Sequence, residues 1–365
     1  MRPSCVGGHR SHGYPQARLE GLALTEALDH ACAMDLHELA VHGVVSTCDA
    51  NRLGLGPYEI GRLCARGHLR RLIRGWYAVR PPDAAAAPWD GETSWEQELN
   101  RHRLLTAALL RSFGGRVVAS HQSALVLHDA RLFGVDLGVA HLVRVADSHS
   151  RHRRDAVIHP ALPYPAVIAP CGLPTVDPAV AAVQIGLIQQ GEHRPDGIPS
   201  LVAADGLLHT GAITGASLQA ALDLFASHPG IAAVREALRH AEARHESVGE
   251  TRLAAALRVL GYDVEPQVWP RQGGSRADFR IKGEPVIVEF DGLAKYSIGS
   301  EVTPEAVRRG LSREKLREDE LRLEGWSFVR VQWFELGSLP TIHRKVEMAR
   351  QLAGHLGAGT RVSAR

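Results

Sequence analysis

The run PVIVEFDG at residues 285–292 constrains the fold more than any other segment of the chain. Its apolar, β-branched residues predict a buried strand, which ends in two acids. Side chains two positions apart in a strand point to one face, so Glu289 and Asp291 are expected to lie on the same face. An acid pair that ends an apolar run favours a chemical role, while a solvated strand end before a glycine turn remains the alternative.

The segments around this run predict a compact α/β unit. A helix is expected at 247–260, strands at VEPQVW and ADFRIKG before the run, a helix at 304–324, the strand SFVRVQW and a last helix. This α-β-β-β-α-β order places a C-terminal domain at about residues 246–355.

Four acids of this unit are candidates for a metal-dependent site. Hydrolysis of a phosphodiester at neutral pH needs a divalent cation, held by two or three converging carboxylates. Asp278 opens the strand before the acid pair, and Glu250 lies on the preceding helix. We therefore expect Asp278, Glu289 and Asp291 to bind Mg²⁺ or Mn²⁺. For Glu250 the alternative is a capping box with Ser247, three residues earlier.

The string E-x(27)-D-x(10)-E-F-D-G-x-x-K-Y, followed by EKLREDELRLEGW and FVRVQW, resembles the PD-(D/E)XK superfamily. More closely, it resembles bacterial proteins with a domain like the very short patch repair endonuclease. The resemblance implies metal binding by Asp278 and Glu289, with Asp291 in the third position and Glu250 as the helix acid. The family's lysine after the second acid is replaced by Asp291, so Lys295 is expected to stabilise the charged transition state, with Lys315 as the alternative.

A second domain is expected at residues 23–82. Helical spacing from Leu22 to Gly43, a short helix after Ser46, and a third helix from Pro57 precede LRRLIRGWYAVR, which alternates like a two-stranded hairpin. Ile60 and Leu63 are expected to point inward. This is the order of a winged helix-turn-helix.

The winged helix is rich in arginine. Residues 34–80 hold seven arginines and four acids. Cations on the third helix and wing would neutralise phosphates and hold the helix in the major groove, and a protein-docking module is the alternative. The expected DNA-binding residues are Tyr58, Arg62, Arg66, Arg70, Arg71 and Arg74.

The string G-x-L-R-R-L-I-R-G-W-Y-A resembles the N-terminal domain of AbiEi-type antitoxins, and ASHQSALVLHDA resembles that family's second domain. The resemblance covers about residues 34–215. It implies a DNA-binding regulator of abortive-infection or toxin–antitoxin systems, with a cognate toxin or a second copy of the chain as partner.

The remaining segments predict no chemistry. Residues 1–22 are interpreted as a disordered leader, 83–92 as a linker, and 93–240 as a mixed α/β middle domain. Ser123 lies between His121 and His128 without an oxyanion loop, so Ser120 is interpreted as a helix cap instead. The basic run HSRHRRD at 149–155 is typical of an exposed hairpin loop.

Composition excludes several classes of protein. With 45% apolar and 22% charged residues, the chain is expected to be a multi-domain α/β (α+β) protein. No run of 18 apolar residues and no signal peptide occurs, and the five cysteines show no CxxC pair. A cytoplasmic protein is therefore expected. Our leading hypothesis is a DNA-targeting, metal-dependent endonuclease; the alternative is an antitoxin-type regulator whose nuclease-like domain is degenerate.

Overall fold

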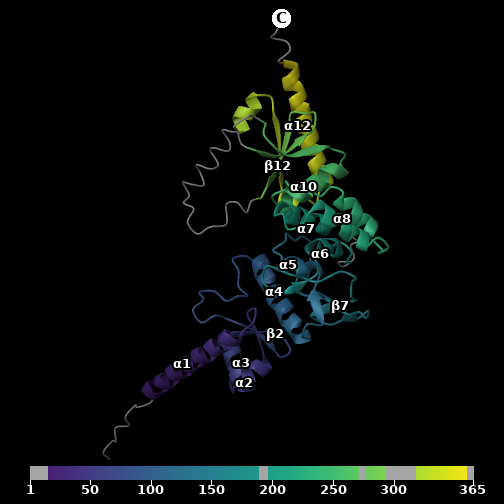
Figure 1. The fold of residues 1–365 in the computed structure, drawn as a ribbon. Helices are drawn as coiled ribbons and strands as arrows, with labels where there is room; N and C mark the ends of the chain where they lie inside the picture. Colours follow the sequence, from purple (N-terminus) through teal and green to yellow (C-terminus); the bar gives the residue numbers. More distant parts are fainter. Residues whose placement is uncertain (1–14, 189–195, 271–275, 293–317, 360–365) are drawn as a thin grey trace, which may run out of the picture. The chain divides into compact units, whose positions relative to one another are not determined.

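The computed structural model describes residues 15–188, 196–270, 276–292 and 318–359 (Figure 1). It divides into two compact units: the first comprises Met1–Ala119 and Leu137–Leu162, the second Ser120–Asp136 and Pro163–Arg365. Helices and several sheets occur, so the predicted multi-domain α/β class is confirmed. None of the described helices is long and apolar enough to cross a membrane.

The first unit begins with a winged helix-turn-helix, in the order that the sequence predicts. Its elements are α1 (Pro15–Leu39), β1 (Val44–Ser46), α2 (Thr47–Arg52), α3 (Pro57–Ala65), β2 (Leu69–Ile73) and β3 (Trp76–Val79). The strands form an antiparallel sheet in the order β1-β3-β2. Ile60 and Leu63 are buried as predicted. The expected leader is wrong for residues 15–22, which belong to α1.

Local hydrogen bonds fix the turn between α2 and α3. Ser46 caps α2, because its Oγ accepts from the N–H of Asp49 while the Asp49 carboxylate accepts from the N–H of Ser46. Pro57 opens α3, where its missing N–H costs nothing, and Glu59 accepts from the N–H of Gly56. These hydrogen bonds define where α2 and α3 begin.

The rest of the first unit is a long helix with four strands. The elements are α4 (Ser94–Phe113), β4 (Val117–Ala119), β5 (Ala140–Arg144), β6 (Arg151–His152) and β7 (Ala156–His159). The strand order is β6-β7-β5-β4, with β5 and β7 parallel and the other pairs antiparallel. The basic run at 149–155 contains the exposed β6, in agreement with a hairpin loop.

The second unit joins a group of helices to an α/β sandwich. The helical group also contains two short strands. Its elements are α5 (His121–Leu127), β8 (Val167–Ile168), β9 (Pro174–Thr175), α6 (Pro178–Ile185), α7 (Ile198–His209), α8 (Gly215–Leu224) and α9 (Ile231–Leu238). The predicted middle domain, residues 93–240, is thus divided between the two units, and its borders stay a prediction.

The sandwich agrees with the α/β unit predicted at 246–355. Its elements are α10 (Val248–Val259), β10 (Val264–Val268), β11 (Ala277–Ile281), β12 (Val286–Asp291), a short helix at 318–323, β13 (Ser327–Gln332), a 3-10 turn (Trp333–Glu335) and α12 (Leu339–Gly359). The sheet order is β10-β11-β12-β13, with β12 and β13 parallel and the other pairs antiparallel.

The two faces of this sheet differ in what covers them. Phe279, Val288 and Val331 belong to one core with residues of α10 and α12. Figure 1 shows both helices beside this sheet. The opposite face carries a smaller cluster around Ile287 and Leu321. Since Glu289 and Asp291 alternate with Val288 and Phe290, which belong to or pack against the larger core, the acid pair lies on the opposite face, on the side of Ile287.

Candidate functional site

The structure brings three of the predicted acids onto neighbouring positions of the sheet. Phe279 of β11 pairs with Val288 of β12, and one further step of this antiparallel register sets Asp278 opposite Glu289. Oδ2 of Asp278 accepts a hydrogen bond from the N–H of Phe290 at 2.8 Å. Asp278 and Glu289 thus lie next to a paired position of β11 and β12, and Asp291 is the last residue of β12.

An arginine that the sequence analysis did not single out lies beside these acids. Arg330 is the partner of Glu289 in the parallel register of β12 and β13. Its Nε lies 3.8 Å from Oε2 of Glu289, and its Nη2 lies 3.1 Å from Oε2 of Glu318. The face thus carries a cation of its own. Only the strand register reveals this pair, because 41 positions separate the two residues in the sequence.

Glu250 makes hydrogen bonds at the start of α10, but they form only half of the capping box that was the alternative to metal binding. Ser247 Oγ accepts from the N–H of Glu250, whereas the Glu250 carboxylate accepts from the N–H of Glu246 in place of that of Ser247. Its side chain is 6% exposed, and both of its carboxylate oxygens accept hydrogen bonds. Oε1 accepts from Ser247 Oγ at 2.8 Å, and Oε2 accepts from Glu246 N–H at 2.9 Å and Gln267 Nε2 at 2.7 Å. In this structure Glu250 fixes the start of α10.

The acids fit a two-carboxylate metal site better than the predicted three-carboxylate site. Among the described residues, no three acids of this face offer one oxygen each within 4.8 Å of one another. Mg²⁺ is commonly held by one or two carboxylates together with water and phosphate oxygens. Asp278 and Glu289 are suited to that role. Lys295 and Lys315 lie outside the described residues, so their roles stay predictions.

The histidines and serines at 120–128 make polar contacts with one another and with Thr175. Ser120 occupies the predicted N-cap position of α5, yet its Oγ lies 2.9 Å from His121 Nδ1 and makes no capping hydrogen bond to the helix. His128 Nε2 lies 2.9 Å from Thr175 Oγ1, and burial lowers the pKa of His128. These contacts agree with a structural role.

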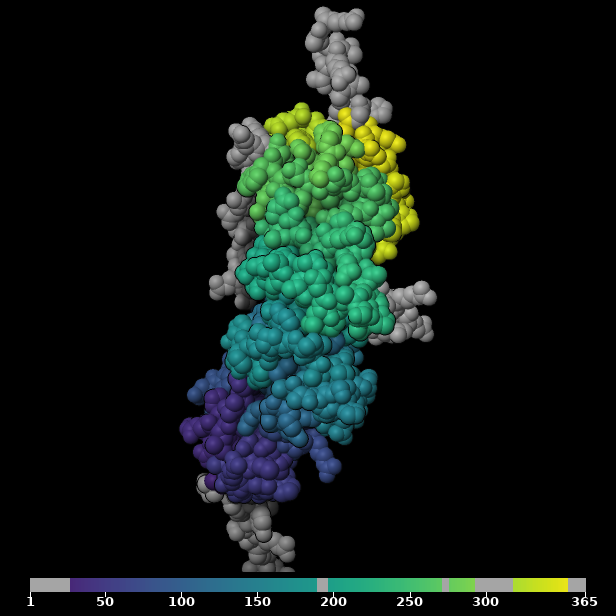
Figure 2. Space-filling view, turned by 45° about the vertical axis from the view of Figure 1, so that its right-hand side comes forward, coloured from purple at the N-terminus to yellow at the C-terminus, as the bar shows by residue number. Residues whose placement is uncertain are grey.

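The winged helix presents some of the predicted DNA-binding residues to solvent. Tyr58 on α3 is 74% exposed, and Arg71 and Arg74 on β2 and the following turn are exposed. The winged-helix residues, purple in Figure 2, form part of the surface drawn there. Tyr58, Arg71 and Arg74 thus place an aromatic ring and two guanidinium groups on the third helix and the wing.

Arg62 and Arg66 have a partner inside the domain. Asp29 of α1 is fully buried, and its carboxylate oxygens lie 2.7 Å from Nε of Arg62 and 3.1 Å from Nε of Arg66. The hydrogen bond to Asp29 raises the pKa of Arg62. These two arginines hold α3 against α1, a role that the count of basic residues does not reveal.

Arg70 and the neighbouring helix α4 also support the wing. Burial lowers the pKa of the half-buried Arg70, and the positive charge of Arg101 adds to the effect. Arg111 of α4 lies over the ring of Trp76 at 4.9 Å and donates to the carbonyl of Val44. Of the predicted residues, Tyr58, Arg71 and Arg74 are therefore best placed to contact a partner.

A family model described as "Transcriptional regulator, AbiEi antitoxin" matches residues 34–80. This range coincides with the part of the winged helix from the end of α1 to the end of β3. No curated protein matches the chain. The predicted resemblance to AbiEi-type antitoxins is thus confirmed for the N-terminal domain, and residues 34–80 form a domain of the kind found in AbiEi transcriptional regulators. Its extension to residue 215, and the nuclease resemblance of the C-terminal domain, stay predictions.

Proposed function

We propose that this chain is a DNA-binding regulator of the antitoxin type, which contacts duplex DNA through α3 and the β2–β3 hairpin. The winged helix at the position of the AbiEi family match, with its exposed aromatic and cationic residues, supports the proposal. Helices of this kind enter the major groove, while wing cations contact phosphates. As in other antitoxins, the partner besides DNA is a cognate toxin or a second copy of the chain.

The test is selection of binding sequences from a random duplex library by the full chain. Tyr58→Ala, Arg71→Ala and Arg74→Ala should each weaken retention of the selected duplex. The control is Arg116→Ala, an exposed arginine outside the winged helix whose Nε donates to the carbonyl of Phe113. Failure to retain any duplex by the wild type would overturn the proposal in favour of a protein-docking module.

A second function, metal-dependent hydrolysis of phosphodiesters, is supported by the position of Asp278 opposite Glu289. We propose that these two carboxylates hold Mg²⁺ or Mn²⁺, with Asp291 at the strand end as a third ligand or a base that orients water. The bound metal would supply an activated water and offset charge at phosphorus. Arg330 would hold the Glu289 carboxylate in position, and Lys295 is proposed to stabilise the charged transition state.

Cleavage of supercoiled plasmid and of short single- and double-stranded DNA tests this second function. The wild type should cut with Mg²⁺ or Mn²⁺, and Asp278→Asn and Glu289→Gln should each abolish cutting. The control is Glu284→Gln, an acid in the turn between β11 and β12 that pairs with Arg350 at 2.6 Å. Mn²⁺ should also raise the melting temperature of the wild type and of Glu284→Gln, but not that of Asp278→Asn or Glu289→Gln. If the wild type binds DNA but neither cleaves it nor gains thermal stability with metal, the second function is overturned and DNA-binding regulation is the function that remains.

A further inference from the structure

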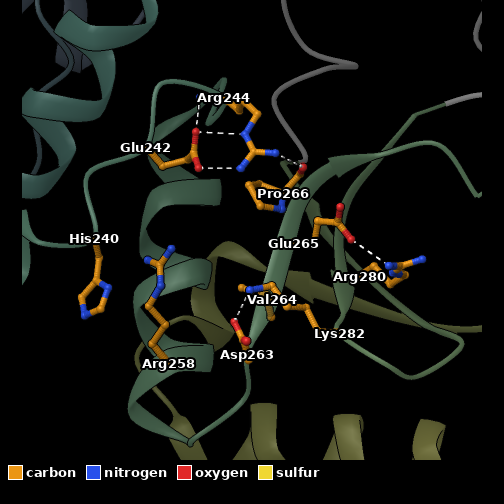
Figure 3. Close-up of a pocket in the computed structure, with 10 residues that line it drawn as sticks. All are labelled: His240, Glu242, Arg244, Arg258, Asp263, Val264, Glu265, Pro266, Arg280 and Lys282. Carbon is orange, nitrogen blue, oxygen red and sulfur yellow. Dashed lines mark hydrogen bonds and ion pairs between the residues drawn. The ribbon is translucent and has the colours of Figure 1, made fainter. Parts of the chain in front are cut away.

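A polar pocket of about 630 Å³ opens in the second unit (Figure 3). Its lining comes from the segment after α9, from α10, and from β10 and β11. The residues are His240, Glu242, Arg244, Arg258, Asp263, Val264, Glu265, Pro266, Arg280 and Lys282. The volume lies within the range of pockets that bind small molecules.

Each of the three acids in the lining already has a cation. Glu242 bonds Arg244 at 2.8 Å, Glu265 bonds Arg280 at 2.8 Å, and Asp263 bonds Lys282 at 2.9 Å. Figure 3 shows these pairs as dashed lines around the pocket. Four cationic side chains of arginine and lysine therefore face three carboxylates, and one positive charge is left over.

That charge belongs to Arg258. Its Nη1 is buried, and among the residues that the structure describes it has no hydrogen-bond partner. Burial lowers the pKa of Arg258, while the charges of Asp205, Glu242 and Asp263 act in the opposite direction. Figure 3 draws its guanidinium in the pocket, between His240 and β10. Nε of Arg280 is a second buried donor without a hydrogen-bond partner in the described chain.

A partly buried guanidinium with one buried, unsatisfied nitrogen is costly unless an acceptor reaches it. A charged acceptor with two or more oxygens suits the planar fork of arginine best, since it can take two parallel hydrogen bonds. The pocket is much larger than a bare ion, so the acceptor is expected to be part of a larger molecule.

We propose that this pocket binds a phosphate group, held by the guanidinium of Arg258, with the exposed donors of the surrounding arginines at its rim. The phosphate comes either from a free nucleotide or from the backbone of a DNA strand, and both sources share the chemistry that Arg258 would recognise. Arg258 lies on α10 and not on β11 or β12, so the variants that test this pocket leave Asp278 and Glu289 unchanged.

Titration calorimetry of the full chain with inorganic phosphate and with adenosine monophosphate tests the proposal. Arg258→Met should weaken binding of both probes by about tenfold or more, because a charge-assisted hydrogen bond is lost. Arg258→Lys keeps the charge and loses the fork, so it should weaken binding less. The matched control is Arg239→Met, an exposed arginine of the same segment that pairs with Glu236 at 3.3 Å and does not line the pocket.

The source of the phosphate follows from competition. The competition uses the Arg71→Ala/Arg74→Ala variant, in which DNA binding by the winged helix is weakened. A short DNA duplex should displace adenosine monophosphate from this variant if the DNA backbone is the ligand of the pocket. Displacement by nucleotides alone would identify a nucleotide site. No binding of either probe by the wild type, or equal binding by wild type and Arg258→Met, would overturn the proposal.

Discussion

At the scale of single residues, two histidines make the first unit sensitive to acid. Nδ1 of His141 lies 2.9 Å from Nε2 of His159, so one ring must donate a hydrogen bond to the other and at least one must be neutral. Burial lowers the pKa of His141 from 6.5 to about 3, with the charges of neighbouring histidines adding to the effect. Burial likewise lowers the pKa of His159 from 6.5 to about 4.

These values predict that stability falls as pH decreases. The unfolded chain binds protons at these histidines near pH 6.5, before the folded chain does, so the stabilisation is complete above pH 6.5. It is lost as pH falls from there to about 4 for His159 and to about 3 for His141. Each histidine contributes a slope of at most about 1.4 kcal/mol per pH unit. Urea unfolding at several pH values measures this slope, which should flatten in a His141→Gln/His159→Gln variant. An unchanged slope would contradict the assignment.

Gly249 is a residue whose size the fold restricts. A Cβ at this position in α10 would overlap the ring of Phe290 in β12. Gly249→Ala should therefore lower the free energy of unfolding by about 1–3 kcal/mol, through overpacking that exceeds the better helix propensity of alanine. The control is Gly215→Ala at the start of α8, where a Cβ meets nothing within 4 Å. Equal melting temperatures for both variants would count against the close packing of α10 on β12.

Residue roles were predictable where local chemistry decides them. Ile60 and Leu63 follow from helical spacing, and the shared face of Glu289 and Asp291 follows from strand alternation. Asp29 and Arg330 were missed because their partners lie far along the chain. An ion pair between residues far apart in the chain produces no periodic pattern in the sequence.

At the scale of elements, a buried polar network joins α7 to the start of α10. Asp205 of α7 is fully buried; its Oδ2 lies 2.6 Å from His245 Nδ1 and accepts from Thr251 Oγ1 at 2.8 Å. Its Oδ1 accepts from the N–H of Glu242 at 2.8 Å. The carboxylate thus positions the segment that leads from the helical group into the α/β sandwich.

Removal of this carboxylate should destabilise the second unit. Asp205→Ala removes the acceptor of three donors, of which those of His245 and Thr251 belong to fully buried residues, and should cost about 3 kcal/mol or more. Asp223→Ala on α8, whose carboxylate accepts only from Gln219 among the hydrogen bonds described, should cost little. Differential scanning calorimetry of both variants checks the difference. A small effect of Asp205→Ala would show that apolar packing alone joins α7 to α10.

Most elements were predictable because caps and hydrophobic periods are local. Ser247 and Leu260 bound α10 as predicted, and the strands of the C-terminal sheet follow their alternation. The start of α1 was missed because residues 15–22 show no apolar period. The division of residues 93–240 between two units was missed because it depends on contacts between distant segments.

At the scale of the whole molecule, the chain combines a winged helix of the AbiEi type with an α/β sandwich whose acids lie on one face of a sheet. The winged helix would supply DNA binding, and the acids of Asp278 and Glu289 would supply metal binding. DNA binding by the winged helix depends on cationic side chains that contact phosphates. Such contacts release counterions from DNA, so the salt dependence of binding distinguishes this role from protein docking.

The salt dependence of duplex binding is the most direct test of that role. Fluorescence anisotropy with a selected duplex should show log K falling linearly with log salt for the wild type. The slope should be shallower by about 1.8 in Arg71→Ala/Arg74→Ala, since each lost phosphate contact removes about 0.9. Arg116→Ala should leave the slope unchanged. Equal slopes and affinities for the wild type and the double variant would contradict DNA contact by the winged helix.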